Sequence, residues 1–384
     1  MSEKKHTKHT ALMKPSGGAF HRNEWAIIGA PCGLVHQLVD DLSNHLQNRW
    51  KVGYLDADHK EPAEPLLHNV HYTDRIAYQQ LRFQQKPGQK QYRALFEPLD
   101  ALLVNGNHFM GDQQIVIVHE KKRASLERKL DRLTEVRMVL LADGHSEPFP
   151  FLHPYLPADV PTFLLKDTES IASFIEEELE NRLPPLKGLV LAGGKSTRMG
   201  TDKGTLNYHG KPQREFLADL MTPFCDETWI SLRQGQEAIS EEYPILHDTF
   251  TGLGPFGAIV SAFREDPNAA WLTVAVDLPY LSMDSLMALV DGRNPSKLAT
   301  CFHNPNTGFP EPLITIWEPR AYPKLLEFLA QGYSCPRKVL INTDVEEMPL
   351  LSLEEIYNAN HPDEYRAAKE KLASPNAAGS TKTE

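Results

Sequence analysis

The segment from Lys187 to Lys203, which reads KGLVLAGGKSTRMGTDK, limits the possible folds of this chain more than any other segment. Residues 189–192 are apolar and run directly into two glycines, a pattern that predicts a buried strand leaving a parallel sheet. Gly193 and Gly194 lack a Cβ atom, so the backbone can turn sharply and bring its N–H groups against a ligand. The following loop adds three basic side chains, Lys195, Arg198 and Lys203. Backbone amides beside basic side chains favour a site for a polyphosphate.

This loop, residues 191–203, matches neither the G-x-x-x-x-G-K-[ST] pattern of a Walker A loop nor the G-x-G-x-x-G dinucleotide pattern. An ordinary glycine-rich turn between a strand and a helix is the alternative, but such turns are seldom this long or this basic. The string L-A-G-G-x-S-x-R-M-G-x-D-K instead resembles the signature loop of the nucleotidyltransferases related to MobA, the molybdenum cofactor guanylyltransferase. We call residues 191–203 the signature loop.

The composition sets limits on partners and location. The chain has 384 residues, of which 41% are hydrophobic and 24% are charged, and this is enough for two or three domains with real cores. Its formal net charge of −11 argues against general nucleic-acid binding. The four cysteines are scattered and form no CxxC pair, so we expect free thiols in a reducing compartment. No apolar run is long enough for a signal peptide or a membrane span. We therefore expect a cytoplasmic protein without a membrane partner.

The pattern along the chain predicts two folded domains. Strand-like apolar runs alternate with amphipathic helical stretches in both halves, which indicates an α/β protein with two three-layer α/β/α domains and mainly parallel sheets. Two prolines at 184 and 185 interrupt the helix before them and mark the boundary. We expect a disordered segment at 1–23, a first domain at 24–184, a second at 186–373 and a flexible tail at 374–384.

The first domain begins like a P-loop domain but lacks the residues that give a P-loop its chemistry. An apolar strand, WAIIGA from Trp25, leads through a glycine turn into a helix. Leu34 stands where a P-loop needs lysine, and Val35 stands where it needs a hydroxyl for Mg²⁺. The half resembles MobB, the small GTPase-like adaptor of the same pathway, with Asn105 in place of an acidic residue in the strand LLVNGNH. The resemblance implies a degenerate domain that is catalytically inactive; an unrelated α/β domain is the alternative. In either case we assign this half no chemistry, and docking or cofactor handling is our hypothesis for its role.

Three polar residues after the strand that ends near Asp56 are candidates for a metal site. Asp56, Asp58 and His59 follow one another closely, and carboxylates with an imidazole can hold a cation. Acidic residues at the end of a strand are as often solvated turn formers, and this interpretation stays open.

In the second domain, we look for functional groups at the carboxyl ends of the strands, where open α/β sheets bind their ligands. The resemblance to MobA implies that the start of the signature loop lines the nucleotide, through Leu191, Ala192, Gly193 and Gly194. In this family the glycine pair goes with guanine, whereas cytidine-specific relatives have LAAG. Arg198 and Lys203 would hold the triphosphate, for which an arginine fork and a lysine point charge are suited. A solvated loop lysine is the alternative for Lys203.

Three further strand ends match the family pattern. Asp248 follows an apolar run and would lie near the nucleotide, although an Asx turn would also explain it. Gly254, in GLGPFG, precedes a helix whose N-terminal amides favour an anion. Asp277, in VDLP, matches the D-x-P motif whose aspartate binds Mg²⁺ in the family, and a carboxylate at a strand end suits this hard cation. The acceptor-binding candidates implied by the resemblance are Arg337, Lys338, Asn358 and Asn360.

The resemblance therefore implies a Rossmann-like nucleotidyltransferase domain with Lys203, Arg198 and Asp277 as catalytic residues. We expect Mg²⁺-dependent transfer of GMP from GTP to molybdopterin, which forms molybdopterin guanine dinucleotide and pyrophosphate. Molybdoenzymes or their chaperones would be the protein partners. The alternatives are the use of CTP, a sugar-phosphate acceptor, or a non-catalytic protein that binds or delivers the molybdenum cofactor.

Overall fold

The computed structural model describes residues 11–58, 66–236 and 242–374. The chain divides into two compact units between Leu183 and Pro184. The N-terminal unit comprises residues 16–183, and the C-terminal unit comprises residues from Pro184 onward together with the segment that ends at Pro15. The ends of the chain that the sequence predicts to be disordered or flexible, residues 1–10 and 375–384, lie outside the described residues, and so does His59. In the described part of the chain, no helix is long and apolar enough to cross a bilayer.

The N-terminal unit is built on a six-stranded sheet with the order β2-β5-β1-β6-β7-β8. All of its strand pairs are parallel. The strands are β1 (Glu24–Ile28), β2 (Val52–Leu55), β5 (Ala101–Asn105), β6 (Gln113–Val118), β7 (Val136–Leu141) and β8 (Thr162–Leu164). The inner strands β5, β1 and β6 are buried along their whole length, as the continuous apolar runs predict.

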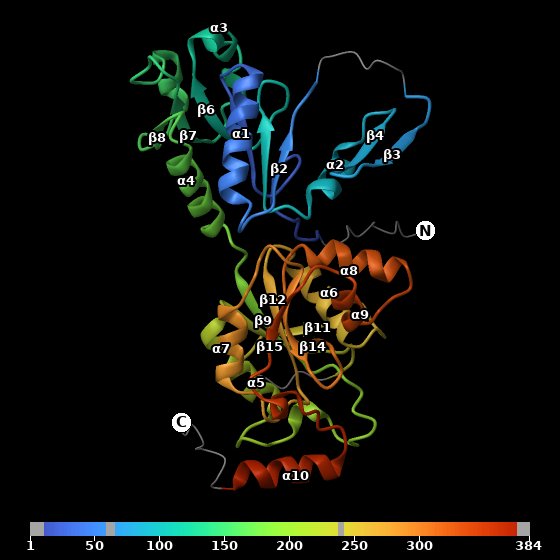
Figure 1. Cartoon of the computed structure of the whole chain (residues 1–384). Helices are drawn as coiled ribbons and strands as arrows, with labels where there is room; N and C mark the ends of the chain where they lie inside the picture. The colour runs from blue at the N-terminus through green and yellow to red at the C-terminus, as the bar shows by residue number, and fades with distance from the viewer. Residues whose placement is uncertain (1–10, 59–65, 237–241, 375–384) are drawn as a thin grey trace, which may run out of the picture. The chain divides into compact units, whose positions relative to one another are not determined.

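Helices cover both faces of this sheet. Helices α1 (Cys32–Leu46) and α4 (Thr168–Glu180) lie side by side on one face (Figure 1) and pack on the residues of β1, β5 and β6. The other face is covered by shorter elements, among them α3 (Arg123–Glu127). Helix α3 ends at Glu127, and only a short 3-10 turn follows at Leu130–Arg132.

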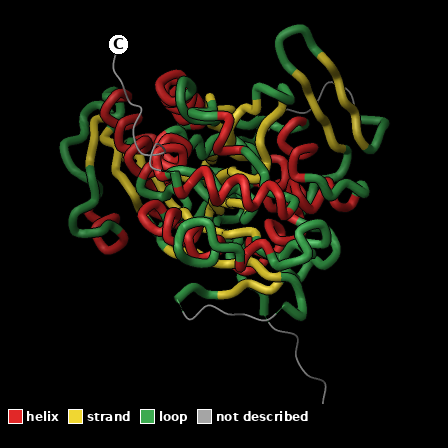
Figure 2. The backbone as a smooth tube through the Cα atoms, turned by 90° about the horizontal axis from the view of Figure 1, so that it is seen from below, coloured by secondary structure: helices red, strands yellow, loops and turns green. Residues whose placement is uncertain are grey.

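The sequence pattern gives no sign of the segment between β2 and β5. It contains helix α2 (Gln89–Phe96) and a hairpin of β3 (Val70–Asp74) and β4 (Gln79–Phe83). Figures 1 and 2 show the hairpin as an arm that extends away from the sheet of its own unit. Its strands have no fully buried residues, so the sequence shows neither an apolar run nor a clear alternation of apolar and polar residues there.

Within the predicted disordered segment 1–23, the residues just before β1 are ordered. The carboxylate of Glu24 accepts hydrogen bonds from the backbone N–H groups of Ala19, Phe20 and His21. The His21 side chain is buried, and its ring lies 3.1 Å from the carbonyl oxygen of Leu99. The residues just before β1 are ordered, although their composition predicts disorder, because the buried Glu24 carboxylate accepts hydrogen bonds from three of their backbone N–H groups.

The C-terminal unit has a seven-stranded sheet with the order β11-β10-β9-β12-β14-β13-β15. The strands are β9 (Leu186–Leu191), β10 (Glu227–Leu232), β11 (Ile245–His247), β12 (Ala270–Ala275), β13 (Ala299–Asn304), β14 (Phe309–Trp317) and β15 (Glu346–Pro349). Of the described strands in this sheet, only β14 runs antiparallel to both of its neighbours. The prediction of an α/β fold with mainly parallel sheets is therefore confirmed for both units.

Strand β9 is an inner strand of this sheet, and its residues belong to two cores on opposite faces. Val190 packs with helices α5 (Gln213–Met221) and α7 (Met283–Asp291), whereas Leu189 and Leu191 pack with α6 (Pro255–Glu265) and α8 (Ala321–Ala330). The remaining helices are α9 (Pro336–Ile341) and α10 (Pro362–Ala373). Three layers result, and the carboxyl ends of the parallel strands β9, β10, β11 and β12 lie at one edge of the sheet.

Candidate active site

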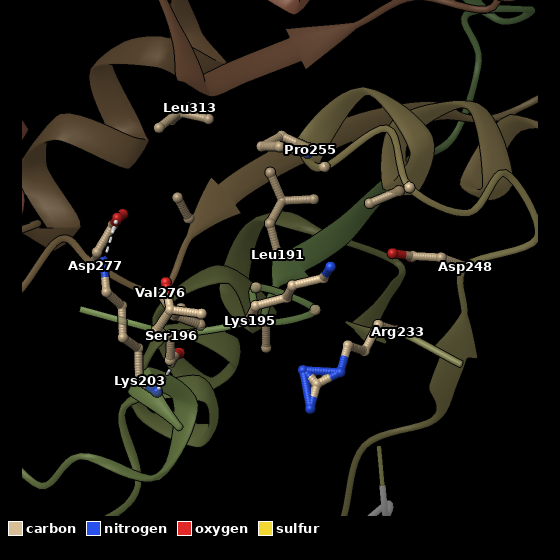
Figure 3. A pocket seen from close by; sticks show the side chains of 18 of the residues that line it. Leu191, Lys195, Ser196, Lys203, Arg233, Asp248, Pro255, Val276, Asp277 and Leu313 are labelled. Atoms are coloured by element: carbon tan, nitrogen blue, oxygen red, sulfur yellow. Dashed lines mark hydrogen bonds and ion pairs between the residues drawn. The ribbon is translucent and has the colours of Figure 1, made fainter. Parts of the chain in front are cut away.

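A cleft of about 710 Å³ lies at this edge of the C-terminal sheet. It is lined by the signature loop after β9, by residues after β10, β11 and β12, and by the first turn of α6. Figure 3 shows Asp277 and Lys203 on one side of the end of β9, and Asp248 and Arg233 on the other side. A parallel sheet places the residues that follow its strands together, and here it assembles groups that are far apart in the sequence.

The two glycines of the signature loop meet different surroundings. A Cβ atom on Gly193 would lie 2.9 Å from the backbone nitrogen of Arg233 and 3.1 Å from Oδ2 of Asp248. A Cβ atom on Gly194 would meet nothing within 4 Å. Gly193 therefore permits the close approach of β9 to the end of β10, while Gly194 leaves its backbone open to the cleft.

The rest of the signature loop folds back so that Lys203 enters the cleft. Ser196 has a positive φ of 49°, a strained conformation for a residue with a side chain, and its Oγ accepts a hydrogen bond of 3.1 Å from the backbone N–H of Lys203. Asp202 accepts one hydrogen bond from the backbone N–H of Gly204 at 2.9 Å and another from Nε2 of Gln236 at 2.7 Å. These contacts fix the backbone on both sides of Lys203.

Lys203, Asp277 and Asn360 form the most tightly connected polar group in the cleft. Nζ of Lys203 lies 3.1 Å from Oδ2 of Asp277 and donates a hydrogen bond of 2.6 Å to Oδ1 of Asn360. The Lys203 and Asp277 side chains are only 14% and 19% exposed, so solvent screens this ion pair less than a surface pair. These three residues belong to separate motifs of the family pattern, and the structure brings them together.

The other carboxylate oxygen of Asp277 fits a bound cation. Oδ1 of Asp277 is buried and has no hydrogen-bond partner among the described residues. An unpartnered carboxylate oxygen is a suitable donor for a hard divalent ion such as Mg²⁺, and the amide oxygen of Asn360, which bonds to the same lysine as Asp277, is a further oxygen donor in the cleft. In the described part of the chain, no three His, Cys, Asp or Glu side chains cluster as a metal site. A cation at Asp277 would therefore need phosphate oxygens or water as its remaining ligands.

Asn360 is held in place by the start of helix α10. The Glu364 carboxylate accepts the backbone N–H groups of Asn360 at 2.6 Å and His361 at 2.9 Å. These two N–H groups hold the pKa of the Glu364 carboxyl below its ordinary value. The backbone N–H of Ala359 donates to the carbonyl oxygen of Asp277 at 2.9 Å, so the segment is also tied to the end of β12.

Asp248 lies on the opposite side of the cleft in a polar but buried setting. Its Oδ1 accepts a hydrogen bond of 2.6 Å from Oγ of Ser231, and its carbonyl oxygen accepts one from Nε2 of Gln234. Burial raises the pKa of the Asp248 carboxyl above its ordinary value, although the bond from Ser231 opposes this effect. Its remaining oxygen, Oδ2, is the atom that approaches Gly193.

The first turn of α6 completes the wall. Gly254 is the N-cap residue and has a positive φ of 58°, which favours glycine. Ser261 anchors the turn that precedes it, since its Oγ accepts the backbone N–H groups of Thr249 and Phe250 at 2.9 and 3.2 Å. The N-terminal end of this helix therefore faces the cleft with its partial positive charge.

Most predicted site residues line this one cleft, but three do not. The lining includes Leu191, Ala192, Gly193, Gly194, Arg198, Lys203, Asp248, Gly254, Asp277 and Asn360. Arg337, Lys338 and Asn358 are not part of it. On α9, Arg337 approaches Glu311 at 3.8 Å and the Lys338 ammonium lies over the ring of Tyr333. Asn358 donates to the carbonyl oxygen of Ile356 at 3.1 Å.

Sequence reasoning missed two side chains beside the cleft, Arg233 and Gln234. Both come after β10, which pairs in parallel with β9. Only their position directly after an apolar strand could have indicated that they lie at the cleft, because they belong to no recognised motif.

Asp56 and Asp58, the metal candidates of the N-terminal unit, gain no support. Oδ1 of Asp56 accepts hydrogen bonds from Nδ2 of Asn105 at 2.8 Å and from the backbone N–H of Ala57 at 2.7 Å. Oδ2 accepts from the hydroxyl of Tyr54. Among the described residues around it, Asp56 therefore acts as a turn-forming acceptor.

Comparison with known proteins agrees with this geometry. Residues 188–346 match the family model described as the MobA-like NTP transferase domain. A molybdenum cofactor biosynthesis bifunctional protein of Synechocystis is 36% identical over 183 residues, which are 47% of this chain and 53% of that protein. The chain thus spans about half the length of this relative. A probable molybdenum cofactor guanylyltransferase of Synechococcus elongatus is 30% identical over 193 residues, which are 47% of this chain and 95% of that protein.

Among solved structures, molybdopterin-guanine dinucleotide biosynthesis protein A of Archaeoglobus fulgidus is 24% identical, with a TM-score of 0.41 over 48% of this chain and 97% of that protein. The sequence relatives carry the assignment, because the match to the Synechococcus protein covers nearly all of it. The chain belongs to the MobA-like NTP transferase family.

Proposed function

We propose that the C-terminal unit transfers GMP from GTP to molybdopterin and releases pyrophosphate, with Mg²⁺ as the metal. The observation that supports this most is the group of Lys203, Asp277 and Asn360 at the wall of one cleft with the signature loop. The names of the sequence relatives, a molybdenum cofactor biosynthesis protein and a probable molybdenum cofactor guanylyltransferase, support this choice of substrates.

The reaction needs positioning and charge stabilisation more than covalent catalysis. A phosphate oxygen of the acceptor attacks the α-phosphorus of GTP in line, and pyrophosphate leaves. Arg198 and Lys203 bind the triphosphate and balance the charge that develops during transfer. A Mg²⁺ ion held by Asp277, with Asn360 beside it, would polarise the phosphate oxygens. No covalent intermediate with the protein is required.

The choice of guanine rests on the far side of the cleft. Backbone groups of residues 191–194 border the space in which a base can lie, and Oδ2 of Asp248 is an acceptor beside Gly193. A carboxylate can accept the N–H donors on the edge of guanine, which cytosine presents in a different pattern. The close packing at Gly193 supports the family rule that a glycine pair goes with guanine.

The acceptor site is the less defined part of the proposal. Arg337, Lys338 and Asn358 lie outside the cleft lining, and we keep them as a proposed binding surface for the phosphate and pterin of the acceptor. Asn360 is the acceptor-side candidate that lines the cleft itself. Molybdoenzymes or their chaperones would receive the product.

Pyrophosphate release from the full chain tests this function. The protein is given Mg²⁺ and molybdopterin with GTP, CTP, ATP or UTP in separate reactions, beside the variants Lys203→Ala and Asp277→Ala. Release with GTP alone, and its loss in both variants, is the expected result. Release with CTP, or with a sugar phosphate in place of molybdopterin, would move the assignment to another nucleotidyltransferase. GTP binding without any release would favour a binding or delivery protein.

A further inference from the structure

The N-terminal unit has its own group of reactive side chains at the carboxyl ends of β1, β2 and β5, and the nucleotidyl transfer does not use them. The glycine turn after β1 leads to Cys32, the first residue of α1. The segment NGNH at the end of β5 supplies His108. Sγ of Cys32 lies 3.2 Å from Nε2 of His108, within hydrogen-bonding distance. The glycine turn after β1 and the loop after β5, which lack the residues of a working P-loop domain, thus bring a thiol and an imidazole together.

We propose that Cys32 and His108 form a nucleophilic thiol–imidazole pair that reacts with small, negatively charged electrophiles. A nucleophile and a base within hydrogen-bonding distance of each other are the basic arrangement of covalent catalysis by cysteine. This function is separate from the nucleotidyl transfer, because all of its residues belong to the N-terminal unit.

The two segments are held together by Asn107. Its Nδ2 donates a hydrogen bond of 3.0 Å to the carbonyl oxygen of Ala30 and lies 3.9 Å from Sγ of Cys32. Its backbone N–H donates to Oδ1 of Asn105 at 3.1 Å. The loop after β5 is therefore fixed against the turn before α1, and the thiol and the imidazole keep their separation without help from a ligand.

Positive charge gathers on the same side of the unit. Nζ of Lys129 donates to the carbonyl oxygen of Asn107 at 2.9 Å, and a guanidinium nitrogen of Arg132 donates to that of Gly106 at 2.9 Å. Burial lowers the pKa of the Lys129 ammonium, and the charges of Arg132 and Lys122 lower it further. Helix α1 has 15 residues, and the partial positive charge at its start also acts on Cys32. These charges attract an anion to the thiol–imidazole pair.

The carboxyl end of β2 adds one carboxylate, that of Asp56, to the same edge of the sheet. Tyr54 lies near the end of β2 and Asp56 directly after it, and the Tyr54 hydroxyl donates to Oδ2 of Asp56 at 3.0 Å. Asn105 donates to the other oxygen of the same carboxylate at 2.8 Å. With the backbone N–H of Ala57, which also donates to this carboxylate, three donors hold it at the end of β2.

The reaction step balances without an oxidant. The Cys32 thiol gives its proton to Nε2 of His108, and the sulfur attacks an electrophilic carbon. A C–S bond forms, the bond from that carbon to its leaving group breaks, and the leaving group departs with the electron pair. Iodoacetate is a suitable probe because it combines such a carbon with a carboxylate.

The chain contains its own reference thiols. Burial raises the pKa of Cys225 to about 12 and also raises the pKa of Cys301, so these two thiols resist alkylation. Cys335 is exposed and serves as an ordinary accessible thiol. Differences among the four thiols in one sample therefore report local chemistry and not protein concentration.

The test is competitive labelling of the full chain with limiting iodoacetate or iodoacetamide at neutral pH, followed by mass spectrometry of the four cysteine peptides. We expect iodoacetate to label Cys32 on the order of tenfold faster than Cys335. The ratio of the iodoacetate rate to the iodoacetamide rate should also be higher at Cys32, because only iodoacetate is attracted by the cations. A Cys32 rate equal to or below that of Cys335 would overturn the proposal.

Two variants separate the pair from mere exposure. His108→Gln should bring the Cys32 rate down to that of Cys335, whereas His145→Gln, a change at another histidine of the same unit, should not alter it. Lys129→Gln should lower the iodoacetate-to-iodoacetamide ratio at Cys32 and leave the iodoacetamide rate nearly constant. An unchanged Cys32 rate in folded His108→Gln protein would exclude the role of the imidazole. The comparison of Cys32 with Cys335 in the wild-type chain decides the proposal even if His108→Gln fails to fold.

Discussion

The two units begin with the same pattern, an inner parallel strand that ends in a glycine turn, but they differ in the segment after the turn. After β9 the chain enters the long signature loop, whose Lys203 and Arg198 line a cleft. After β1 the chain enters α1 almost at once. Leu34, at the P-loop lysine position, packs against the core, and Val35, at the hydroxyl position, is fully buried in it. The comparison shows that the sheet supplies a place for ligands, while the loops supply the chemistry.

The two units also differ in the side chains at the carboxyl ends of their strands. In the C-terminal unit, the strand ends keep a carboxylate beside a lysine and an amide, with one oxygen unpartnered among the described residues. In the N-terminal unit, the Asp56 carboxylate is engaged by Tyr54 and Asn105, and a thiol with a histidine takes the position of the phosphate loop. We therefore expect nucleotide chemistry in the first site and thiol chemistry in the second.

The largest effect is expected from Asp277→Ala. If the C-terminal cleft alone transfers the nucleotide, loss of the carboxylate that fits the cation should lower turnover by about 10³-fold or more. Thermal unfolding should change little, because the variant removes, along with the ion pair, a buried oxygen that has no partner among the described residues. Steady-state pyrophosphate release and a melting curve measure both effects. Turnover within tenfold of wild type would mean that the active centre lies elsewhere.

Lys203→Met should lower turnover by about 10²-fold, because a single charge that stabilises the transition state is lost. It should also have an effect of opposite sign on metal binding. The ammonium lies 3.1 Å from Asp277, where it competes with a cation, so Mn²⁺ should bind the nucleotide-free variant at least about threefold more tightly. Electron paramagnetic resonance of free Mn²⁺ measures this, with Lys195→Met as the matched control. Weaker Mn²⁺ binding in Lys203→Met would contradict the competition.

Gly193→Ala sharpens the comparison between the two glycines of the signature loop. The added Cβ would lie 2.9 Å from the backbone nitrogen of Arg233, so β9 and β10 must shift and GTP turnover should fall by about tenfold or more. Gly194→Ala, where a Cβ meets open space, should keep its fold and serve as the control. The kcat/KM values for GTP and CTP measure the outcome. Equal losses at the two positions would show that backbone packing is not the reason for the glycine at 193.

The smallest effect is expected from Glu364→Gln, which weakens the support of Asn360. The folded-state pKa of Glu364 is lowered, so its charge stabilises the fold above its ordinary pKa, and this contribution is lost as the pH falls through the lowered value. The variant should therefore unfold more easily by about 1 kcal/mol or less at neutral pH, and not at all in acid. Urea unfolding at both pH values checks this. A difference that persists in acid would indicate lost packing instead of lost charge.

The sequence predicts the strand ends well because buried parallel strands leave continuous apolar runs. The apolar run at 227–232 coincides with strand β10, and the residues that follow β9, β11 and β12 line one cleft. It does not reveal the hairpin β3–β4, whose residues are largely exposed, nor the antiparallel direction of β14, because an apolar run is the same in either direction. The family resemblance predicts Arg337 and Lys338 as acceptor-binding residues. A sequence motif carries no information about how α9 packs, and this packing places both residues outside the cleft lining.

Equilibrium binding of GTP to the full chain tests most directly the claim that the two strand-end sites have separate chemistries. A titration in the presence of Mg²⁺, measured by calorimetry, should find a single site per chain. The double variant Arg198→Ala/Lys203→Ala should lose that site and keep the rapid labelling of Cys32 by iodoacetate. A second GTP site in the wild type, or GTP binding that survives in the double variant, would contradict the account, because nucleotide would then be held outside the C-terminal cleft.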